Sequence, residues 1–361
     1  MVNPPHSPAA APSTAPSTAM ARETREAPDA VARLLDREMP AIEAVGRRLA
    51  ARNPPVVVTC ARGSSDHAAH YLKYLLETAT GIPVASMGLS VASVYGTRLQ
   101  LRDGVLVTIS QSGRSPDLVA FQAAARAGGA LAVAILNDTD GPVADGADIV
   151  LPLHAGPEAS VAATKSFIAS AAAAAALVAA WTGDAVLRDA VLRLPDALSR
   201  ALAQDWSAAE AALVAAPSCY MLGRGPGLAI ALEAALKGKE TAALHAEAFS
   251  LAEVMHGPVQ LVAPAFPLVA FLPEDAAAAE NRGALERLAA AGGQVFAATP
   301  IGQGGGDKVP GTVLPVAPGG HPALDPLAMI ASFYLLIERV ARRRGLDPDR
   351  PSHLQKVTRT M

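Results

Sequence analysis

Short apolar segments alternate with longer helical stretches along this chain, and the same order of segments occurs in both halves. In the first half the apolar segments are 55–60, 105–110, 130–137 and 147–153. In the second half they are 218–225, 266–273, 293–299 and 312–317. Strands that alternate with helices form βαβ units. The sequence therefore predicts an α/β fold, in which each parallel sheet is doubly wound and flanked by helices on both faces.

Two Arg-Gly pairs indicate that the halves arose by duplication. Arg62-Gly63 follows the first apolar segment of one half, and Arg224-Gly225 follows the first apolar segment of the other. Another glycine lies 33 residues after Gly63 and 32 residues after Gly225. Such equal spacing is typical of an internal repeat. We expect a tail over 1–22, domains over 23–195 and 196–345, and a C-terminal tail over 346–361.

Composition excludes several classes of partner. The chain has 361 residues, 17% of them charged, with a net charge of −3 and no basic run. Neither nucleic acid nor a membrane is therefore an expected partner.

Several segments indicate where the protein and its parts are located. The alanine-rich segment 167–181 is too short to span a bilayer and suits a helix in a core or at a subunit contact. The first residues, rich in Pro, Ala, Ser and Thr, indicate a disordered tail without a secretory signal, with Met1 or Met20 as start. Both cysteines lie in or beside apolar runs, as expected of reduced thiols in a cytoplasmic protein.

The segment TISQSGRSPD, residues 108–117, predicts an anion site. A buried strand ends in a turn rich in hydroxyl groups, and a helix follows with Ser115 as N-cap and Pro116 at its first position. The N-terminus of a helix presents unpaired N–H groups and partial positive charge, and the serines add donors. An ordinary βα turn with a well-capped helix would have the same pattern.

The second half instead concentrates ionisable groups. Glu233, Lys237 and Glu240 are spaced i, i+4 and i+7, which places them on one face of a helix, and His256 follows in the segment EVMHGP. Such groups suit proton transfer, although a solvated salt-bridge ladder and a structural histidine are the alternative interpretations. One half would bind an anion while the other supplies acid–base groups.

These segments together resemble the sugar isomerase (SIS) family, in particular the isomerase half of glutamine–fructose-6-phosphate aminotransferase and its stand-alone relatives. The matching segments are ARGSSDHA, SQSGRSPD, AGPEASVAATKSF, LGRGPGLAIALEAALKGKE, HAEAFSLAEVMHGP and DPDRPSHLQKVTRTM. They follow the order of the family from about residue 30 to the end. The resemblance implies two tandem SIS domains.

The resemblance also implies a sugar-phosphate site in the first half. The phosphate-binding residues would be Ser110, Gln111, Ser112 and Ser115. Ser64 and Ser65, at the start of the first helix, would touch the sugar or its phosphate. Val161 and Ala163 would line the sugar pocket, with Ala163 standing where the aminotransferase has a serine.

The catalytic residues implied by the resemblance lie in the second half and the C-terminal tail. Glu240 would move a proton between C1 and C2, with Lys237 among the catalytic residues and Glu233 among those that bind the sugar. His256 would assist ring opening in the site of the neighbouring subunit, which implies a homodimer with a shared active site. Lys356 would contact the sugar carbonyl and can form a Schiff base. His353 stands where the family prefers asparagine, and a frayed basic terminus is the alternative interpretation.

The reaction expected first is the conversion of glucosamine-6-phosphate to fructose-6-phosphate and ammonia, as in the stand-alone deaminases of this type. We do not expect glutamine hydrolysis, because the short N-terminal tail has no room for a glutaminase domain. Alternatives are the isomerase part of glucosamine-6-phosphate synthesis, a related isomerase acting on another amino-sugar phosphate, and a fructosamine-6-phosphate deglycase. A non-enzymatic phosphosugar sensor is a further alternative. Neither a metal nor an organic cofactor is expected, because proton transfer needs none.

Overall fold

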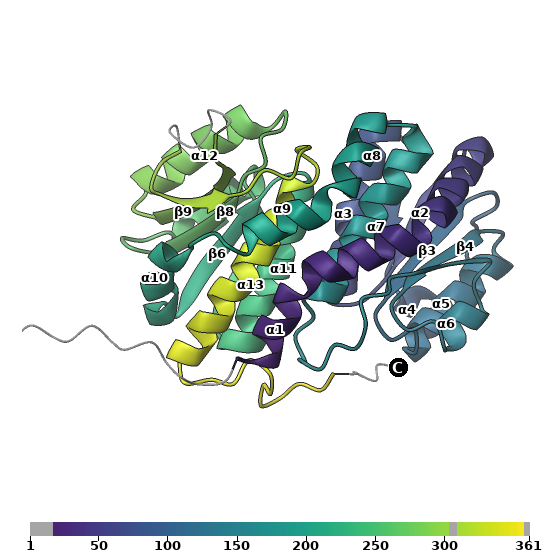
Figure 1. Cartoon of the computed structure of the whole chain (residues 1–361), viewed down its shortest axis with the longest axis horizontal. Helices are drawn as coiled ribbons and strands as arrows, with labels where there is room; N and C mark the ends of the chain where they lie inside the picture. The colour runs from purple at the N-terminus through teal and green to yellow at the C-terminus, as the bar shows by residue number, and fades with distance from the viewer. Residues whose placement is uncertain (1–16, 303–308, 357–361) are drawn as a thin grey trace, which may run out of the picture.

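Two five-stranded sheets form the framework of the computed structural model, which describes residues 17–302 and 309–356 (Figure 1). The first sheet has the order β2-β1-β3-β4-β5, and all of its neighbouring strands are parallel. Its strands are β1 (Val57–Cys60), β2 (Val84–Ser86), β3 (Val105–Ser110), β4 (Leu131–Leu136) and β5 (Ile149–Pro152). Four of the five were predicted from the apolar segments.

The second sheet repeats the strand order of the first. Its order is β10-β9-β8-β6-β7, again with parallel neighbours, so β6 to β10 occupy the places of β1 to β5. Its strands are β6 (Ser218–Gly223), β7 (His245–Ser250), β8 (Pro267–Phe271), β9 (Gln294–Pro300) and β10 (Thr312–Val316). The predicted α/β fold with parallel sheets is confirmed, and the shared topology agrees with a duplication.

The sequence did not predict β2 and β7, the strands beside β1 and β6 at one edge of each sheet. β2 has only three residues, which is too short for a periodic pattern. β7 carries His245 and Glu247 on its exposed side and alanines on the other. Charged side chains are common on edge strands, where they prevent pairing with other chains, and they mask the apolar signal.

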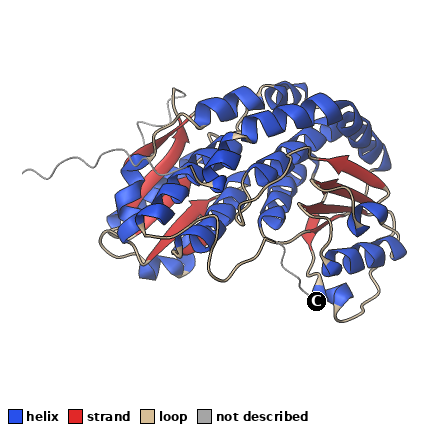
Figure 2. Ribbon diagram, turned by 60° about the horizontal axis from the view of Figure 1, so that its bottom comes forward, coloured by secondary structure: helices blue, strands red, loops and turns tan. Residues whose placement is uncertain are grey.

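Long helices fill the space between the two sheets (Figures 1 and 2). α3 of the first half packs on α11 of the second half, and each also packs on a neighbouring long helix of its own half. The long helices are α2 (Ala27–Arg52), α3 (Ser64–Thr80), α7 (Lys165–Thr182), α11 (Pro226–Ala242) and α13 (Asp325–Arg343). One hydrophobic cluster runs through these helices from one sheet to the other, so the halves share a core.

Helix α7 is the alanine-rich segment, and the structure buries it. Within the described ranges it is the one helix long and apolar enough to cross a membrane, but 89% of that stretch is buried inside the fold. A core helix of a folded domain has the same length and composition. Small side chains let α2 approach closely, since a Cβ on Gly46 would lie 2.5 Å from the Cβ of Ala180.

Helix α1 (Ala19–Arg25) is bound to the C-terminal segment. This helix begins before the expected end of the N-terminal tail at residue 22, because Thr18 caps it and Met20 is fully buried. Asp349 of the C-terminal segment accepts hydrogen bonds from the backbone N–H groups of Ala19 and Met20 at 2.6 and 2.8 Å. The rest of the expected tail, 1–16, lies outside the described residues.

Shorter helices cover the outer faces of the sheets and connect the halves. They are α4 (Ser90–Ser93), α5 (Pro116–Ala127), α6 (Pro142–Asp145), α8 (Ala185–Leu192), α9 (Leu194–Ala201), α10 (Glu210–Ala215) and α12 (Ala278–Ala290), with 3₁₀ turns η1 (Ser207–Ala209), η2 (Glu253–His256) and η3 (Pro258–Leu261). The expected domain boundary at residue 195 falls inside α9. This helix contacts α2 of the first half and α13 of the second.

Candidate functional site

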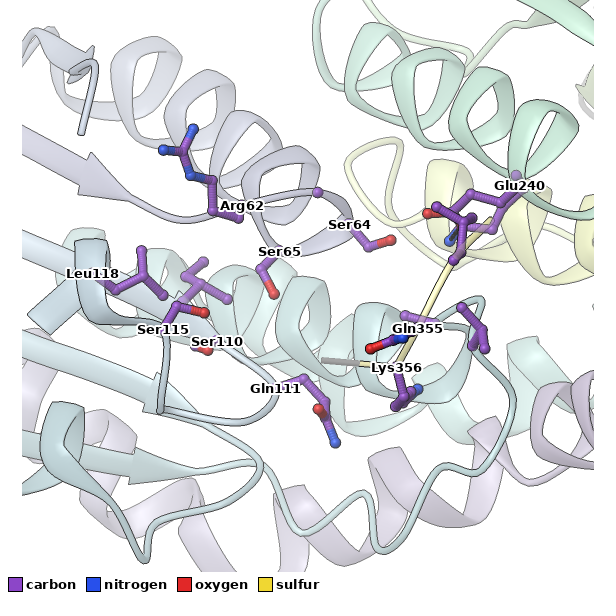
Figure 3. A pocket seen from close by; sticks show the side chains of 16 residues that line it. Arg62, Ser64, Ser65, Ser110, Gln111, Ser115, Leu118, Glu240, Gln355 and Lys356 are labelled. Atoms are coloured by element: carbon purple, nitrogen blue, oxygen red, sulfur yellow. Dashed lines mark hydrogen bonds and ion pairs between the residues drawn. The ribbon is translucent and has the colours of Figure 1, made fainter. Parts of the chain in front are cut away.

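A cavity of about 360 Å³ lies where the two halves and the C-terminal segment meet (Figure 3). Its walls come from the β1–α3 turn, the β3–α5 loop, the loop before α7, the last turns of α11 and residues 354–356. In parallel α/β folds, ligands bind at the carboxyl ends of the strands. The turns after β1 and β3 lie at such ends.

One wall of the cavity is made of hydroxyl and amide groups. Ser64 and Ser65 begin α3, Ser110 ends β3, Gln111 follows it, and Ser115 is the N-cap of α5; all five side chains line the cavity. The N-termini of two helices therefore open at this wall, and both favour an anion. The structure thus brings together five of the six residues expected to hold the sugar phosphate.

Ser112 is the sixth residue, and it belongs to the same loop without lining the cavity. The loop turns sharply behind Gln111, where the Gly113 N–H donates a hydrogen bond of 3.0 Å to the Ser110 Oγ. Gly113 has a φ of +63°, a left-handed conformation that glycine adopts without strain. The role expected for the Ser112 side chain stays a prediction.

Arg62 is a cavity residue to which the sequence assigned no role in binding. Its guanidinium lies on the Asp117 carboxylate, with distances of 2.9 Å from Nε and 2.8 Å from an Nη. Asp117 is buried in the first turn of α5, whereas the Arg62 side chain is half exposed. The pair connects the two helix N-termini that form the hydroxyl wall. In the sequence, the position of Arg62 directly after the first predicted strand was the signal that could have placed it at the site.

Glu240 lies across the cavity from Ser110 and Ser115 (Figure 3), and Lys237 also lines the cavity. The Lys237 Nζ donates a hydrogen bond to Glu240 and lies 3.5 Å from Glu233. Glu233 and Lys237 are at most 1% exposed, while Glu240 is 21% exposed. The salt-bridge ladder is therefore buried, and the alternative of a solvated helix face is wrong.

Buried charges on α11 stabilise one another. Burial alone would lower the pKa of Lys237. The electrostatic attraction of Glu233 and Glu240 has the larger effect, so the pKa lies above its usual value. Burial alone would raise the pKa of Glu233, yet Lys237 and His67 hold it below its usual value. Lys237 therefore stays an ammonium beside the Glu240 carboxylate.

Two residues from other helices complete this network. His67 Nδ1 lies 2.8 Å from one oxygen of Glu233, and the Tyr334 hydroxyl donates a hydrogen bond of 3.0 Å to the other. His67 comes from α3, which belongs to the other half of the fold. Glu233 itself does not line the cavity, so the structure places it behind Lys237 as a support. Contacts between distant helices carry no signal in a single sequence.

The remaining wall combines the loop before α7 with the C-terminal segment. Val161 and Ala163 line the cavity, as do Leu354, Gln355 and Lys356. The Lys356 Nζ donates hydrogen bonds to the Glu158 carboxylate at 3.1 Å and to the Ser160 carbonyl at 2.6 Å. Lys356 is thus bound to a buried carboxylate, and the alternative of a frayed terminus does not hold for this residue.

His256 stands apart from the cavity of its own chain. It is exposed at the end of η2 and is not among the lining residues. Its expected role in the site of a neighbouring subunit stays a prediction. Among the residues that the structure describes, no group of three or more His, Cys, Asp or Glu side chains could hold a metal ion.

Known proteins share both the sequence and the fold. Residues 52–180 match the SIS domain family. Glutamine–fructose-6-phosphate aminotransferases are similar over 313 residues, with 34% identity in Caulobacter vibrioides and 36% in Halobacterium salinarum. Each match covers 83% of this chain and 51% of the relative, so the chain spans about half the length of these relatives.

Two solved structures cover nearly all of the chain. A protein from Silicibacter pomeroyi, provisionally assigned as a phosphosugar isomerase, has 46% identity and a TM-score of 0.87, covering 92% of this chain and 100% of that one. The C-terminal domain of glucosamine-fructose-6-phosphate aminotransferase from Francisella tularensis has 25% identity and a TM-score of 0.84, covering 94% of this chain and 100% of that one. The chain belongs to the SIS (sugar isomerase) domain family, which includes the isomerase half of these aminotransferases.

Proposed function

We propose that this chain is a phosphosugar isomerase that interconverts glucosamine-6-phosphate with fructose-6-phosphate and ammonia. The observation that carries the proposal is the position of Glu240, which lies on the cavity wall opposite the hydroxyl groups and is bound by the buried Lys237. A phosphate held by the hydroxyl wall would direct the carbon chain of the sugar toward this carboxylate. Glu240 is then available as the general base for a carbon-bound proton.

Three cavity residues have separate roles in the proposed proton shift. Glu240 takes the proton from one of the carbons C1 and C2 and returns it to the other, through an enediol or enolamine-type intermediate. The ammonium group of Lys237 donates a hydrogen bond to Glu240 and orients its side chain between turnovers. Lys356, on the wall formed by the C-terminal segment, would donate a hydrogen bond to the sugar oxygen on which negative charge develops.

The direction of the reaction divides the proposal in two. Deamination of glucosamine-6-phosphate, with release of ammonia, is our first candidate. Amination of fructose-6-phosphate is the second, and the similarity to glutamine–fructose-6-phosphate aminotransferases favours it. Both use the same proton transfer by Glu240, so the site geometry is common to them.

The proposal extends to the second half and to the subunit arrangement. The second half is a second SIS domain in this proposal, because its sheet repeats the strand order of the half that contains the family match. The protein would act as a homodimer, in which the exposed His256 of one subunit enters the cavity of the other and assists ring opening.

The experiment that tests the function measures ammonia and fructose-6-phosphate released from glucosamine-6-phosphate. Glucosamine without the phosphate should react very poorly, because the hydroxyl wall would lose its ligand. Formation of glucosamine-6-phosphate from fructose-6-phosphate is then measured, first with an ammonium salt and next with glutamine. The rates of deamination and amination together show which direction the enzyme catalyses. If no amino-sugar phosphate is converted in either direction, the proposed function is wrong.

Glu240→Gln isolates the chemical step. The amide keeps the size of the side chain, so KM should change little, while kcat should fall by about 10²–10⁴ through loss of the general base. Glu247→Gln is a matched control, because Glu247 is exposed on the edge strand β7. A Glu240→Gln enzyme with near-normal kcat would assign the proton transfer to another group.

A further inference from the structure

Glu158 is a buried carboxylate to which neither the expected site nor the proposed mechanism gives a role. Its side chain has no exposed surface, and it lies in the loop before α7. It accepts hydrogen bonds from the backbone N–H groups of Thr164 and Ser166, at 2.9 and 3.2 Å, and from the Ser166 hydroxyl at 2.7 Å. These contacts bind the carboxylate to the N-terminus of α7, where negative charge is favoured.

The remaining contact of Glu158 is with Lys356. The two residues are 198 positions apart in the sequence, and their charged groups are 3.1 Å apart. Val161 and Ala163, which line the cavity, belong to the loop that Glu158 closes by bonding to Thr164. Glu158 therefore binds both this wall of the cavity and the lysine beside it.

We propose that Glu158 is a positioning residue for the proposed reaction, and that its carboxylate holds Lys356 at the cavity wall as an ammonium donor. The expected effect on turnover rests on the proposed function, whereas the contact between Glu158 and Lys356 does not depend on it. An ammonium group donates hydrogen bonds to a sugar oxygen but cannot attack a carbonyl carbon, because it has no free electron pair. Formation of a Schiff base by Lys356 would first require the ammonium group to lose a proton.

The electrostatics around Glu158 agree with this role. Burial alone would raise the pKa of Glu158, but Lys356 and the hydrogen bonds from Ser166 and Thr164 lower it overall. The carboxylate is thus ionised at neutral pH. Glu158 also acts on Lys237 across the site and favours its charged form.

Several other charged or titratable groups surround this pair. They are Glu23 of α1, Glu26 between α1 and α2, His67 of α3, Lys165 of α7, Glu233, Lys237 and Glu240 of α11, and Tyr334 of α13. Among the residues that the structure describes, none of these carboxylates forms a hydrogen bond or an ion pair with Lys356. Glu158 is its carboxylate partner there.

Glu23 offers a matched control. Its carboxylate is also buried, and it accepts hydrogen bonds from the backbone N–H groups of Ala159 and Ser160, in the same loop as Glu158. Burial raises the pKa of Glu23, and Glu158 adds to that effect. Glu23→Gln therefore perturbs the loop but leaves the Glu158 carboxylate, the charged partner of Lys356, in place.

The test measures how well Glu158 holds the Lys356 amine in the complete chain. Acetic anhydride reacts with lysine amines that the reagent can reach, and the labelling rate of Lys356 at one fixed pH is read by peptide mass. In Glu158→Gln, Lys356 should be labelled several-fold faster than in the wild type, because the amine has lost the carboxylate that binds it. Glu23→Gln should leave the labelling rate unchanged, and Glu158→Asp should restore most of the protection.

Activity provides a second readout. In Glu158→Gln, kcat should fall by a larger factor than KM changes, and borohydride should trap more sugar phosphate on Lys356. In that trap the free amine adds to the carbonyl carbon, water leaves, and borohydride reduces the imine to a secondary amine. Equal labelling of Lys356 in wild type, Glu158→Gln and Glu23→Gln would overturn the inference. Because labelling needs no substrate, an enzyme inactive on glucosamine-6-phosphate would refute the proposed function alone.

Discussion

At the scale of single residues, burial makes the ionisable side chains of this site depend on their ion-pair and hydrogen-bond partners. Glu233 and Lys237 have almost no exposed surface, and each is stabilised only by its partners. A solvated ion pair contributes little to stability, whereas breaking a buried pair leaves an uncompensated charge. The network on α11 is thus both part of the proposed catalytic apparatus and a sensitive point of the fold.

Lys237→Met tests this sensitivity. Removing the ammonium leaves the buried Glu233 with His67 and Tyr334 as its hydrogen-bond partners among the described residues. We therefore expect a loss of about 3–5 kcal/mol in the free energy of unfolding, measured in urea. The double variant Lys237→Met/Glu233→Gln removes the unpaired charge and should recover much of that loss. A double variant no more stable than the single one would show that the buried carboxylate is not the cause.

At the scale of elements, close packing between helices holds the two halves of the fold in place. α2 and α7 approach closely at Gly46, where an added Cβ would meet the backbone of α7 at 2.8 Å as well as the Cβ of Ala180. The backbone of a helix cannot move aside as the end of a flexible side chain can. The many alanines of α7 are therefore explained by contact with neighbouring helices.

Gly46→Ala should lower the free energy of unfolding by about 1–3 kcal/mol, because overpacking outweighs the better helix propensity of alanine. Gly283→Ala in α12 is the control, since its nearest contact would be the flexible end of Arg287 at 3.8 Å. That variant should gain about 1 kcal/mol from propensity alone. Thermal and urea unfolding of both proteins would measure the difference, and equal effects of the two substitutions would contradict close packing at α2.

At the scale of the whole molecule, the proposed site draws on both halves, on the C-terminal segment and, in our proposal, on a second subunit. Asp349 binds the C-terminal segment to α1, and Lys356 binds it to the loop before α7. His256 is exposed on the surface of its own chain, as a residue that enters a partner's cavity would be.

Mixing two inactive variants tests the shared site. If Glu240→Gln and His256→Ala subunits exchange freely, half of the dimers are mixed, and each mixed dimer has one site with both groups intact. Activity should then return to about a quarter of the wild-type value. Native mass spectrometry would confirm subunit exchange, and exchange without any recovery would place both groups in one chain.

The local sequence was sufficient to predict most of the framework. Strands β1, β3 and β4 and the start of α5 at Pro116 follow from apolar runs, Pro and Gly positions and a capping serine. These signals are local, because a strand or a helix end depends on residues a few positions apart. Edge strand β7 was missed because its polar residues are determined by its place in the sheet.

The sequence by itself determined the α/β fold, the repeated order of its halves and the hydroxyl-rich loop, because periodicity and turn chemistry are encoded over short distances. The family resemblance added the residues around Glu240. Only the tertiary structure decided that Lys237 is buried, that His67 of the other half binds Glu233, and that Glu158 binds Lys356. Burial and the pairing of distant charges depend on how whole elements pack, and packing joins residues nearly 200 positions apart.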